Sequence, residues 1–218
     1  VAVTGDTVHL LWFGTDFFGT VAHDGIQYSH SFDGGTAFTQ QQTLSSFDTA
    51  LTPGLMAVDG PLVCVAFEAR IDTFTGTVVM RSSDAGMTWA PLQRIDTNSS
   101  TRPLLLESSN GIFYLHYQDV RAARYGLQVS SDGGATWALR NAAMPGLVSM
   151  VATPTRLHGV ATVLGNYSEV VYYTSDNFGA SWIFADVISV EDFTNSDHPR
   201  IATNAGHDSY IVWRDASN

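Results

Sequence analysis

The sequence has no lysine, one cysteine and no long apolar run, and each absence excludes a class of protein. All of its basic charge comes from ten arginines, against 21 acidic residues, so the net charge is −11. Such an acidic surface repels phosphates, which argues against nucleic acids and anionic membranes as partners. The single Cys64 excludes an internal disulfide. No apolar stretch approaches the roughly 20 residues that span a bilayer, so we predict no membrane insertion.

A helical pattern is also missing. No stretch of about ten residues has a clear apolar period of 3.6, whereas short β-branched and aromatic runs alternate with Pro, Gly, Asn and Asp. Hydrophobic residues make up 44% of the 218-residue chain and charged residues 14%, as in a globular protein. The pattern predicts one all-β chain.

A short turn motif occurs four times at nearly regular spacing. Its copies begin at Ser31, Ser82, Ser130 and Thr174. The aspartates two residues later are 51, 48 and 44 residues apart, and such a period is typical of repeat architectures. The motif residues to which we assign a structural role are Asp33, Gly35, Asp84, Gly86, Trp89, Asp132, Gly134, Trp137, Asp176, Gly179 and Trp182.

Each motif can hold a β-hairpin. The aspartate can accept backbone N–H bonds about two residues on, and the glycine can take a positive φ at no steric cost. The closing aromatic ring can bury roughly 150–250 Å². Because these roles explain every residue of the motif, we predict that its aspartates are structural and not catalytic.

The motif resembles the Asp-box, or bacterial neuraminidase repeat, of sialidases and other β-propellers. The second and third copies match Ser-x-Asp-x-Gly-x-Thr-Trp at every defined position. The first copy ends in Ala37-Phe38, and the fourth, read from Thr174, has one extra residue before Gly179. The resemblance implies a β-propeller in which the turn joins the third and fourth strands of a blade, away from the substrate.

Strands upstream of the motifs repeat with a similar period. They cover residues 8–12, 63–67, 113–117 and 160–164, and a fifth copy at 210–213 has no motif after it. We therefore predict a β-propeller of four-stranded antiparallel blades, about four and a half of them in this chain. The predicted blades cover about 1–47, 48–96, 97–144 and 145–190, with a half blade at 191–218.

The half blade would leave a strand edge open. Open edges promote aggregation, and propellers usually close by completing the last blade. We therefore predict that the chain is part of a longer, six-bladed ring, or that a second chain supplies the missing strands. The alternative is that a strand is miscounted and the chain closes alone at four or five blades.

Polar residues gather where second strands end and first strands begin, which is one face of a propeller. Arginines there can bind carboxylates, and acidic residues can act as acid and base. The sialidase resemblance implies a specific role for each of these residues. By this resemblance, Arg102, Arg200 and either Arg70 or Arg121 clamp a carboxylate, Glu68 with Tyr167 forms the nucleophile, and Asp16 or Asp119 is the acid/base. The alternative is that these are solvated rim residues.

The sequence thus predicts a secreted or cell-surface propeller module that binds carbohydrate or another protein, or that serves as a structural repeat. The alternative function is a sialidase-like glycoside hydrolase, an exo-α-sialidase whose remaining blades lie outside this chain. A glycan is the expected ligand. We expect no cofactor, and no His, Cys or Asp cluster has the spacing of a zinc site.

Overall fold

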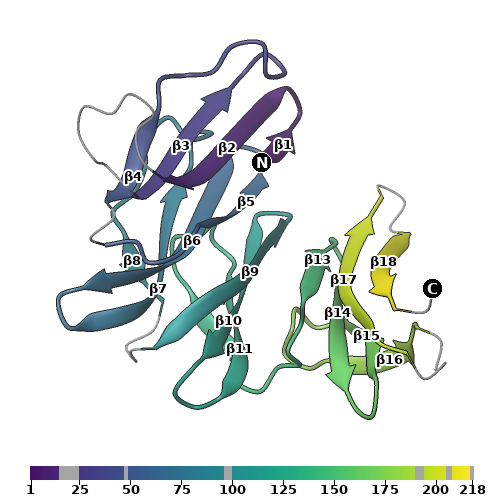
Figure 1. Cartoon of the computed structure of the whole chain (residues 1–218). Helices are drawn as coiled ribbons and strands as arrows, with labels where there is room; N and C mark the ends of the chain where they lie inside the picture. The colour runs from purple at the N-terminus through teal and green to yellow at the C-terminus, as the bar shows by residue number, and fades with distance from the viewer. Residues whose placement is uncertain (15–24, 47–48, 96–99, 190–193, 205–207, 217–218) are drawn as a thin grey trace. The chain divides into compact units, whose positions relative to one another are not determined.

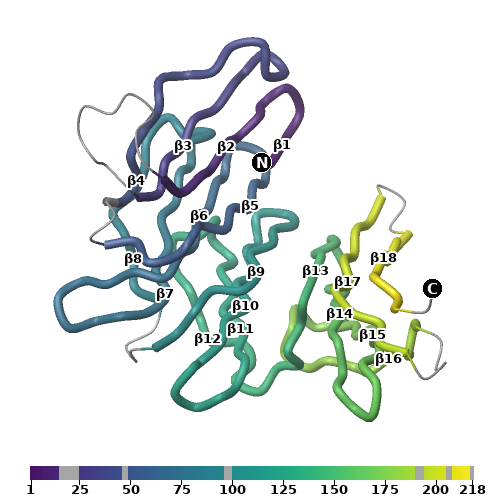
Figure 2. Tube along the Cα trace, viewed as in Figure 1, coloured from purple at the N-terminus to yellow at the C-terminus, as the bar shows by residue number. Residues whose placement is uncertain are grey.

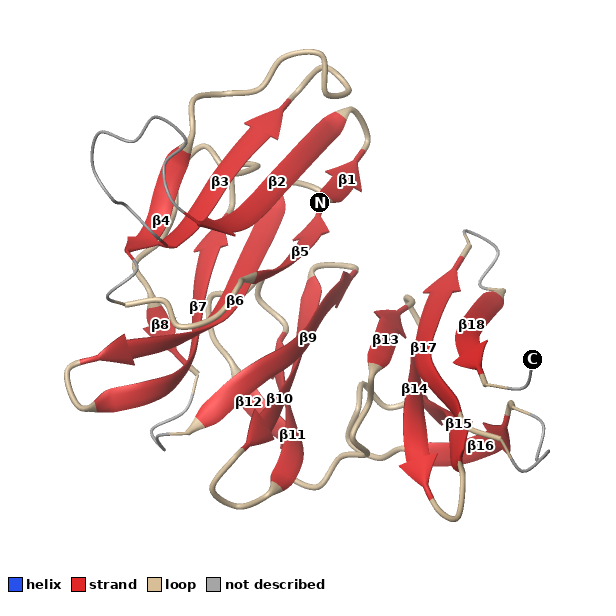
Figure 3. Ribbon diagram, viewed as in Figure 1, coloured by secondary structure: helices blue, strands red, loops and turns tan. Residues whose placement is uncertain are grey.

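The computed structural model describes residues 1–14, 25–46, 49–95, 100–189, 194–204 and 208–216. Within these residues the chain forms eighteen β-strands and no helix, so the all-β prediction is confirmed (Figures 1 and 3). No helix that could cross a membrane is found in this part of the chain.

Four sheets have four antiparallel strands each, and strands adjacent in sequence are neighbours in the sheet. The first sheet contains β1 (Ala2–Thr4), β2 (Thr7–Gly14), β3 (Gly25–Ser31) and β4 (Gln42–Ser46). The second contains β5 (Leu55–Asp59), β6 (Leu62–Ile71), β7 (Phe74–Ser82) and β8 (Gln93–Arg94). The third contains β9 (Thr101–Ser109), β10 (Ile112–Asp119), β11 (Arg124–Ser130) and β12 (Ala138–Asn141). The fourth contains β13 (Ser149–Ala152), β14 (Leu157–Leu164), β15 (Ser168–Ser175) and β16 (Ile183–Val187).

A fifth sheet contains two strands, β17 (Ser196–Thr203) and β18 (Ser209–Asp215). The predicted four-stranded blades and the half blade are therefore present as sheets. The six-bladed ring stays a prediction.

The chain divides into two compact units. The first comprises residues 1–123 and 128–138, and the second comprises residues 124–127 and 139–218. In Figure 2 the first unit begins in purple, and the second ends in yellow. The division falls within the third sheet.

In the first unit, strand β6 is buried on both faces. One face contributes Phe67 to a core that includes Ile26, and the other contributes Cys64 to a core with Phe113 and Leu115. This double burial explains why residues 62–67 are an uninterrupted apolar run and not an alternating one.

The second and third repeat turns share one hydrogen-bond pattern. Ser82 Oγ donates to Asp84 Oδ1 (2.7 Å) and accepts from the Gly86 N–H (2.8 Å). The Thr88 N–H (2.8 Å) and hydroxyl (2.6 Å) both donate to the Asp84 carboxylate. These bonds from Thr88, with the one from Ser82, lower the pKa of Asp84 to about 2. The third turn repeats the pattern with Ser130, Asp132, Gly134 and Thr136.

The first turn keeps the pattern except at its end. Ser31 Oγ donates to Asp33 Oδ1 (2.6 Å) and accepts from the Gly35 N–H (2.9 Å). Ala37 supplies its N–H (2.9 Å) but has no hydroxyl to donate. In these three copies the aspartate accepts the hydrogen bonds that close the turn.

The fourth turn is aligned one residue later than we predicted. Asn177 takes the aspartate position: its Oδ1 accepts from Ser175 Oγ (2.9 Å) and from the Ser181 N–H (3.0 Å), and its Nδ2 donates to Ser181 Oγ (2.8 Å). The Gly179 N–H donates to Ser175 Oγ (2.9 Å), so no residue is inserted. An amide can replace the carboxylate because the turn needs acceptors for these donors and not a charge.

The structural role that we assigned to Asp176 is therefore corrected. Its carboxylate points out of the turn and forms a bidentate ion pair with Arg156, whose Nη2 lies 3.0 Å from Asp176 Oδ2. Both side chains are about half exposed, and such surface pairs contribute little to stability.

The two alignments predict opposite mutational results. We expect Asn177→Ala to lower the free energy of unfolding by about 2 kcal/mol, because it removes three turn hydrogen bonds. We expect Asp176→Ala to lower it by less than about 1 kcal/mol. Urea unfolding of the two variants measures both values. A larger loss of unfolding free energy for Asp176→Ala would favour the alignment with Asp176 in the aspartate position of the turn.

Each later turn also docks on the sheet before it, through its glycine. A Cβ at Gly86 would lie 1.8 Å from the hydroxyl of Tyr28 in the first sheet, and one at Gly134 would lie 2.3 Å from Cys64 Sγ in the second. In the second unit, a Cβ at Gly179 would lie 2.1 Å from Leu127. At Gly35, in contrast, the nearest atoms are 3.9 Å away. The glycine is thus required for close packing as well as for its positive φ.

Side chains of the fourth strands complete this docking. Gln42 Nε2 donates to the Gly86 carbonyl (3.1 Å), and Gln42 Oε1 accepts from the Trp89 ring N–H (3.1 Å). Gln93 Nε2 bonds the Ala135 carbonyl (2.9 Å), and Asn141 Nδ2 bonds the Gly179 carbonyl (3.3 Å). The repeat turns therefore join neighbouring sheets, which is a structural role.

Candidate functional site

A polar cluster lies on the two-stranded fifth sheet, where β17 begins and β18 ends. Arg214 forms a bidentate ion pair with Asp197, with Nε at 2.7 Å and Nη2 at 2.5 Å from the two carboxylate oxygens. The same carboxylate is 2.7 Å from Nδ1 of His198. Asp197 and Arg214 are register partners across the sheet, so the strand pairing itself brings them together.

The backbone at His198 is unusual. The pairing of β17 with β18 shifts between Asp197 and Arg200, and His198 has a φ of 55°. A bulge of this kind re-aims side chains, and a non-glycine residue with left-handed φ is strained. The His198 side chain is 67% exposed. The bulge therefore presents an imidazole to solvent while Asp197 holds one of its nitrogens.

The charged side chains of this cluster differ in whether they have an ion-pair partner. Hydrogen bonds from Arg214 and then from His198 lower the pKa of Asp197 to about 2, so the carboxylate is ionised at neutral pH. Arg214 is occupied by this carboxylate. The Arg200 guanidinium is exposed, bonds the Pro199 carbonyl (2.9 Å) and forms no ion pair within the described residues. Arg200 is thus available to bind an anionic group.

When the His198 imidazole is neutral, its tautomer follows from its contact with Asp197. An imidazole whose Nδ1–H donates to a carboxylate has Nε2 as a hydrogen-bond acceptor when neutral. The arrangement can accept a hydroxyl hydrogen at Nε2 while Arg200 donates to a carboxylate or sulfate oxygen. These are the contacts that acidic sugars require.

Of the residues predicted from the sequence, the structure joins Glu68 and Arg102. Arg102 Nε lies 3.2 Å from Glu68 Oε2, and the Glu68 side chain is 10% exposed. The Glu68 backbone N–H also donates to Thr52 Oγ1 (3.1 Å). Glu68 is thus held in an ion pair of the first unit.

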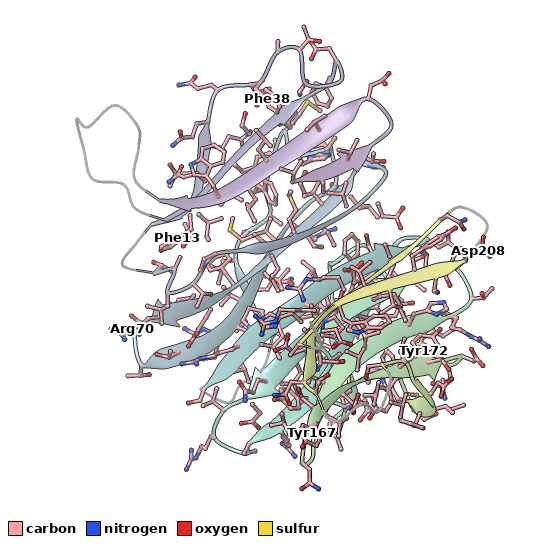
Figure 4. All side chains as sticks on the ribbon, turned by 45° about the vertical axis from the view of Figure 1, so that its right-hand side comes forward. Phe13, Phe38, Arg70, Tyr167, Tyr172 and Asp208 are labelled. Carbon is pink, nitrogen blue, oxygen red and sulfur yellow. The ribbon has the colours of Figure 1, made fainter. Side chains whose placement is uncertain are left out.

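The other predicted residues lie in or next to turns between strands of their own units. Arg70 lies near the β6–β7 turn and Tyr167 in the β14–β15 turn, where Figure 4 labels both. Arg121 is exposed in the β10–β11 turn. The Asp119 carboxylate accepts from the Ala122 N–H (3.0 Å) and so closes that turn. Asp16 lies outside the described residues.

The sequence reasoning placed Arg200 in a site but missed Asp197 as the residue that orients His198. A register argument could have found it, because an acidic residue at the start of one strand faces an arginine at the end of the next. Pro199 was the one sequence signal for the bulge, because a proline cannot donate to the strand ladder and is confined to strand edges, starts or bulges. Among the residues that the structure describes, no three His, Cys, Asp or Glu side chains lie close enough to hold a metal ion.

Comparisons with known proteins define the fold. No family model matches the chain, and no curated protein has a significantly similar sequence. Among solved structures, YCF48 bound to a D1 peptide is similar, with a TM-score of 0.58 and 11% identity over 98% of this chain and 67% of that one. A protein of unknown function from Dyadobacter fermentans has a TM-score of 0.57 and 14% identity, over 92% of this chain and 66% of that one.

A polysaccharide lyase of family PL25, an ulvan lyase bound to -[GlcA(1-4)Rha3S]-, is also similar. Its TM-score is 0.62 and its identity 11%, over 97% of this chain and 60% of the lyase. This chain thus spans about two thirds of the length of these structures. With its blade-like sheets, the likeness identifies the chain as a β-propeller and shows the fold alone.

Proposed function

We propose that this chain is a carbohydrate-binding β-propeller module that recognises an acidic sugar at the β17–β18 cluster. Arg200 binds the acidic group of the sugar, and His198 Nε2 accepts a hydrogen bond from a neighbouring hydroxyl. Asp197 and Arg214 hold the imidazole in place. Consistent with the sequence-based expectation, we place the module outside the cell or on its surface, where polysaccharides occur.

The observation that carries this proposal is the strained, exposed His198. A left-handed histidine costs free energy, on the order of 1–3 kcal/mol, and this side chain is 67% exposed. Strain of this kind is common at ligand sites, where it fixes a side chain in advance of binding. Two solved structures of similar fold support the proposal: an ulvan lyase is bound to an acidic saccharide, and YCF48 is bound to a peptide.

Calorimetric titration with oligosaccharides that contain glucuronic acid tests the proposal. We expect binding to weaken at least about tenfold in both His198→Gly and Arg200→Ala, the size of one lost charge-assisted contact. Glycine accepts the positive φ, so His198→Gly removes the imidazole and should not lower stability. Arg94→Gln, which changes the charge equally in the first unit, serves as the control and should bind like the wild type.

Two outcomes would contradict the proposal. One is wild-type binding by His198→Gly, which would leave the strained histidine without a role in recognition. The other is equal loss in Arg94→Gln, which would mean that the ligand responds to the charge of the whole chain.

The sialidase-like alternative rests on one observation, the Glu68–Arg102 ion pair. It places a carboxylate and an arginine of the predicted constellation together in the first unit. Hydrolysis of a fluorogenic sialoside tests it. Turnover that falls at least about 100-fold in Glu68→Gln would favour a hydrolase. No turnover by the wild type would favour the binding module over the hydrolase.

A further inference from the structure

A second open site lies at the end of the fourth sheet where its strands enter the repeat turn. Thr153, Thr155, Arg156, His158 and Asp176 line a pocket of ≈ 370 Å³ in the second unit. His158 Nδ1 lies 2.6 Å from the hydroxyl of Tyr172, which Figure 4 labels, and 3.4 Å from Ser209 Oγ at the start of β18.

The first sheet has the same pair in a closed state. His9 Nδ1 lies 2.6 Å from the Tyr28 hydroxyl. Each tyrosine lies three residues before the first serine of its turn: Tyr28 before Ser31, and Tyr172 before Ser175. Each of these serines pairs across the sheet with the residue that precedes the histidine. The two pairs therefore occupy equivalent positions of the repeat.

The closed pair is covered by the next repeat turn. The Tyr28 hydroxyl donates to the Ala85 carbonyl (3.3 Å), and Gly86 packs directly on the same hydroxyl. Tyr28 is fully buried, whereas Tyr172 is only partly buried. The pocket over His158 thus corresponds to the place that a repeat turn fills in the first unit.

The neighbouring strand has a matching free edge. Within the residues that the structure describes, β18 is the second strand of its sheet and pairs only with β17, whereas the other second strands have a neighbour on both sides. In the first unit the turn also bonds the residue before the second strand, as the Ala85 N–H does with the Pro61 carbonyl (2.8 Å). The equivalent residue here is Asp208, next to Ser209 and the pocket.

We propose that the pocket over His158 and Tyr172, together with the edge of β18, is the docking site for a β-hairpin that ends in a Ser-x-Asp-x-Gly turn. The first hairpin strand adds to β18 by backbone hydrogen bonding. The turn glycine then lies on the Tyr172 hydroxyl, as Gly86 lies on Tyr28. The inference does not depend on the sugar site, which occupies the opposite end of β17 and β18.

A synthetic hairpin of residues 74–95, which contains the second turn, is the probe. We expect it to bind the intact chain at a ratio of one to one and to shift the NMR resonances of His158 and Ser209. A peptide with the Gly86→Ala change should bind at least about tenfold more weakly, because its Cβ would meet the Tyr172 hydroxyl. The chain variant Tyr172→Phe should bind the unchanged peptide several-fold more weakly, because it keeps the ring but loses the donor to the turn carbonyl.

Three results would overturn the proposal. They are the absence of hairpin binding at millimolar concentration, equal affinity for the glycine and alanine peptides, and shifts confined to residues away from His158 and β18. A dimer of the chain that forms without peptide and resists its addition would assign this edge to a second copy instead.

Discussion

Replacement of Gly86 by alanine is expected to destabilise the first unit by about 4 kcal/mol. The new Cβ would lie 1.8 Å from the Tyr28 hydroxyl, which is fixed by His9 and by a Trp89 ring packed edge-on against it. Overpacking of this kind costs about 1–3 kcal/mol, and a positive φ at a non-glycine residue adds on the order of 1 kcal/mol or more. Equilibrium denaturation of the variant measures the sum.

Gly35→Ala is the matched control for this prediction. Gly35 has a φ of 90°, close to the 88° of Gly86, but a Cβ there meets no atom nearer than 3.9 Å. Gly35→Ala should therefore lower the free energy of unfolding only by the cost of the positive φ, about 1–2 kcal/mol. Equal losses at the two glycines would show that the turns need glycine for φ alone and do not dock through it.

The stability of the first unit is expected to fall by about 3 kcal/mol between pH 6.5 and pH 4 because of His9. Burial, and then the charge of nearby His30, lower the pKa of His9 from 6.5 to about 4 in the folded protein. Since the unfolded histidine binds its proton first as the pH falls, the contribution of His9 is complete above pH 6.5 and is lost toward pH 4.

The variant His9→Asn isolates this effect. An asparagine side chain can still bond the Tyr28 hydroxyl but does not titrate. We expect the stability difference between wild type and variant to shrink as the pH falls from 7 to 4, as followed by urea unfolding at each pH. A constant difference would mean that the imidazole is not buried in its neutral form.

Most of the architecture could be predicted because local chemistry determines it. The turns around Asp84 and Asp132 contain every donor and acceptor that closes them, so a short motif specifies a hairpin. The fourth turn was misread because Asp176 offers the expected residue type one position early. Hydrogen bonding alone shows that Asn177 holds the turn. The predicted strand at 160–164 was also offset. Val8 pairs with Ser31 of the first turn, and the residue that pairs with the equivalent Ser175 is Leu157 and not Val160.

The site was less predictable because it depends on register between strands. Pro199 is compatible with an edge strand as well as with a bulge, so it does not fix the backbone at His198. Asp197 and Arg214 are 17 residues apart in sequence and meet only through strand pairing. Resemblance to sialidases directed attention to Glu68, whose partner in the first unit is Arg102. Chemistry that depends on cross-strand partners could not be assigned from spacing alone.

The proposed function requires that His198 and Arg200 together bind an acidic sugar. NMR titration of the imidazole resonances with a glucuronic-acid oligosaccharide tests it most directly. We predict a saturable shift of the His198 resonance that is absent in Arg200→Ala, while the His9 resonance stays unchanged. A His198 resonance that does not respond to the saccharide, or that responds equally in Arg200→Ala, would contradict the account.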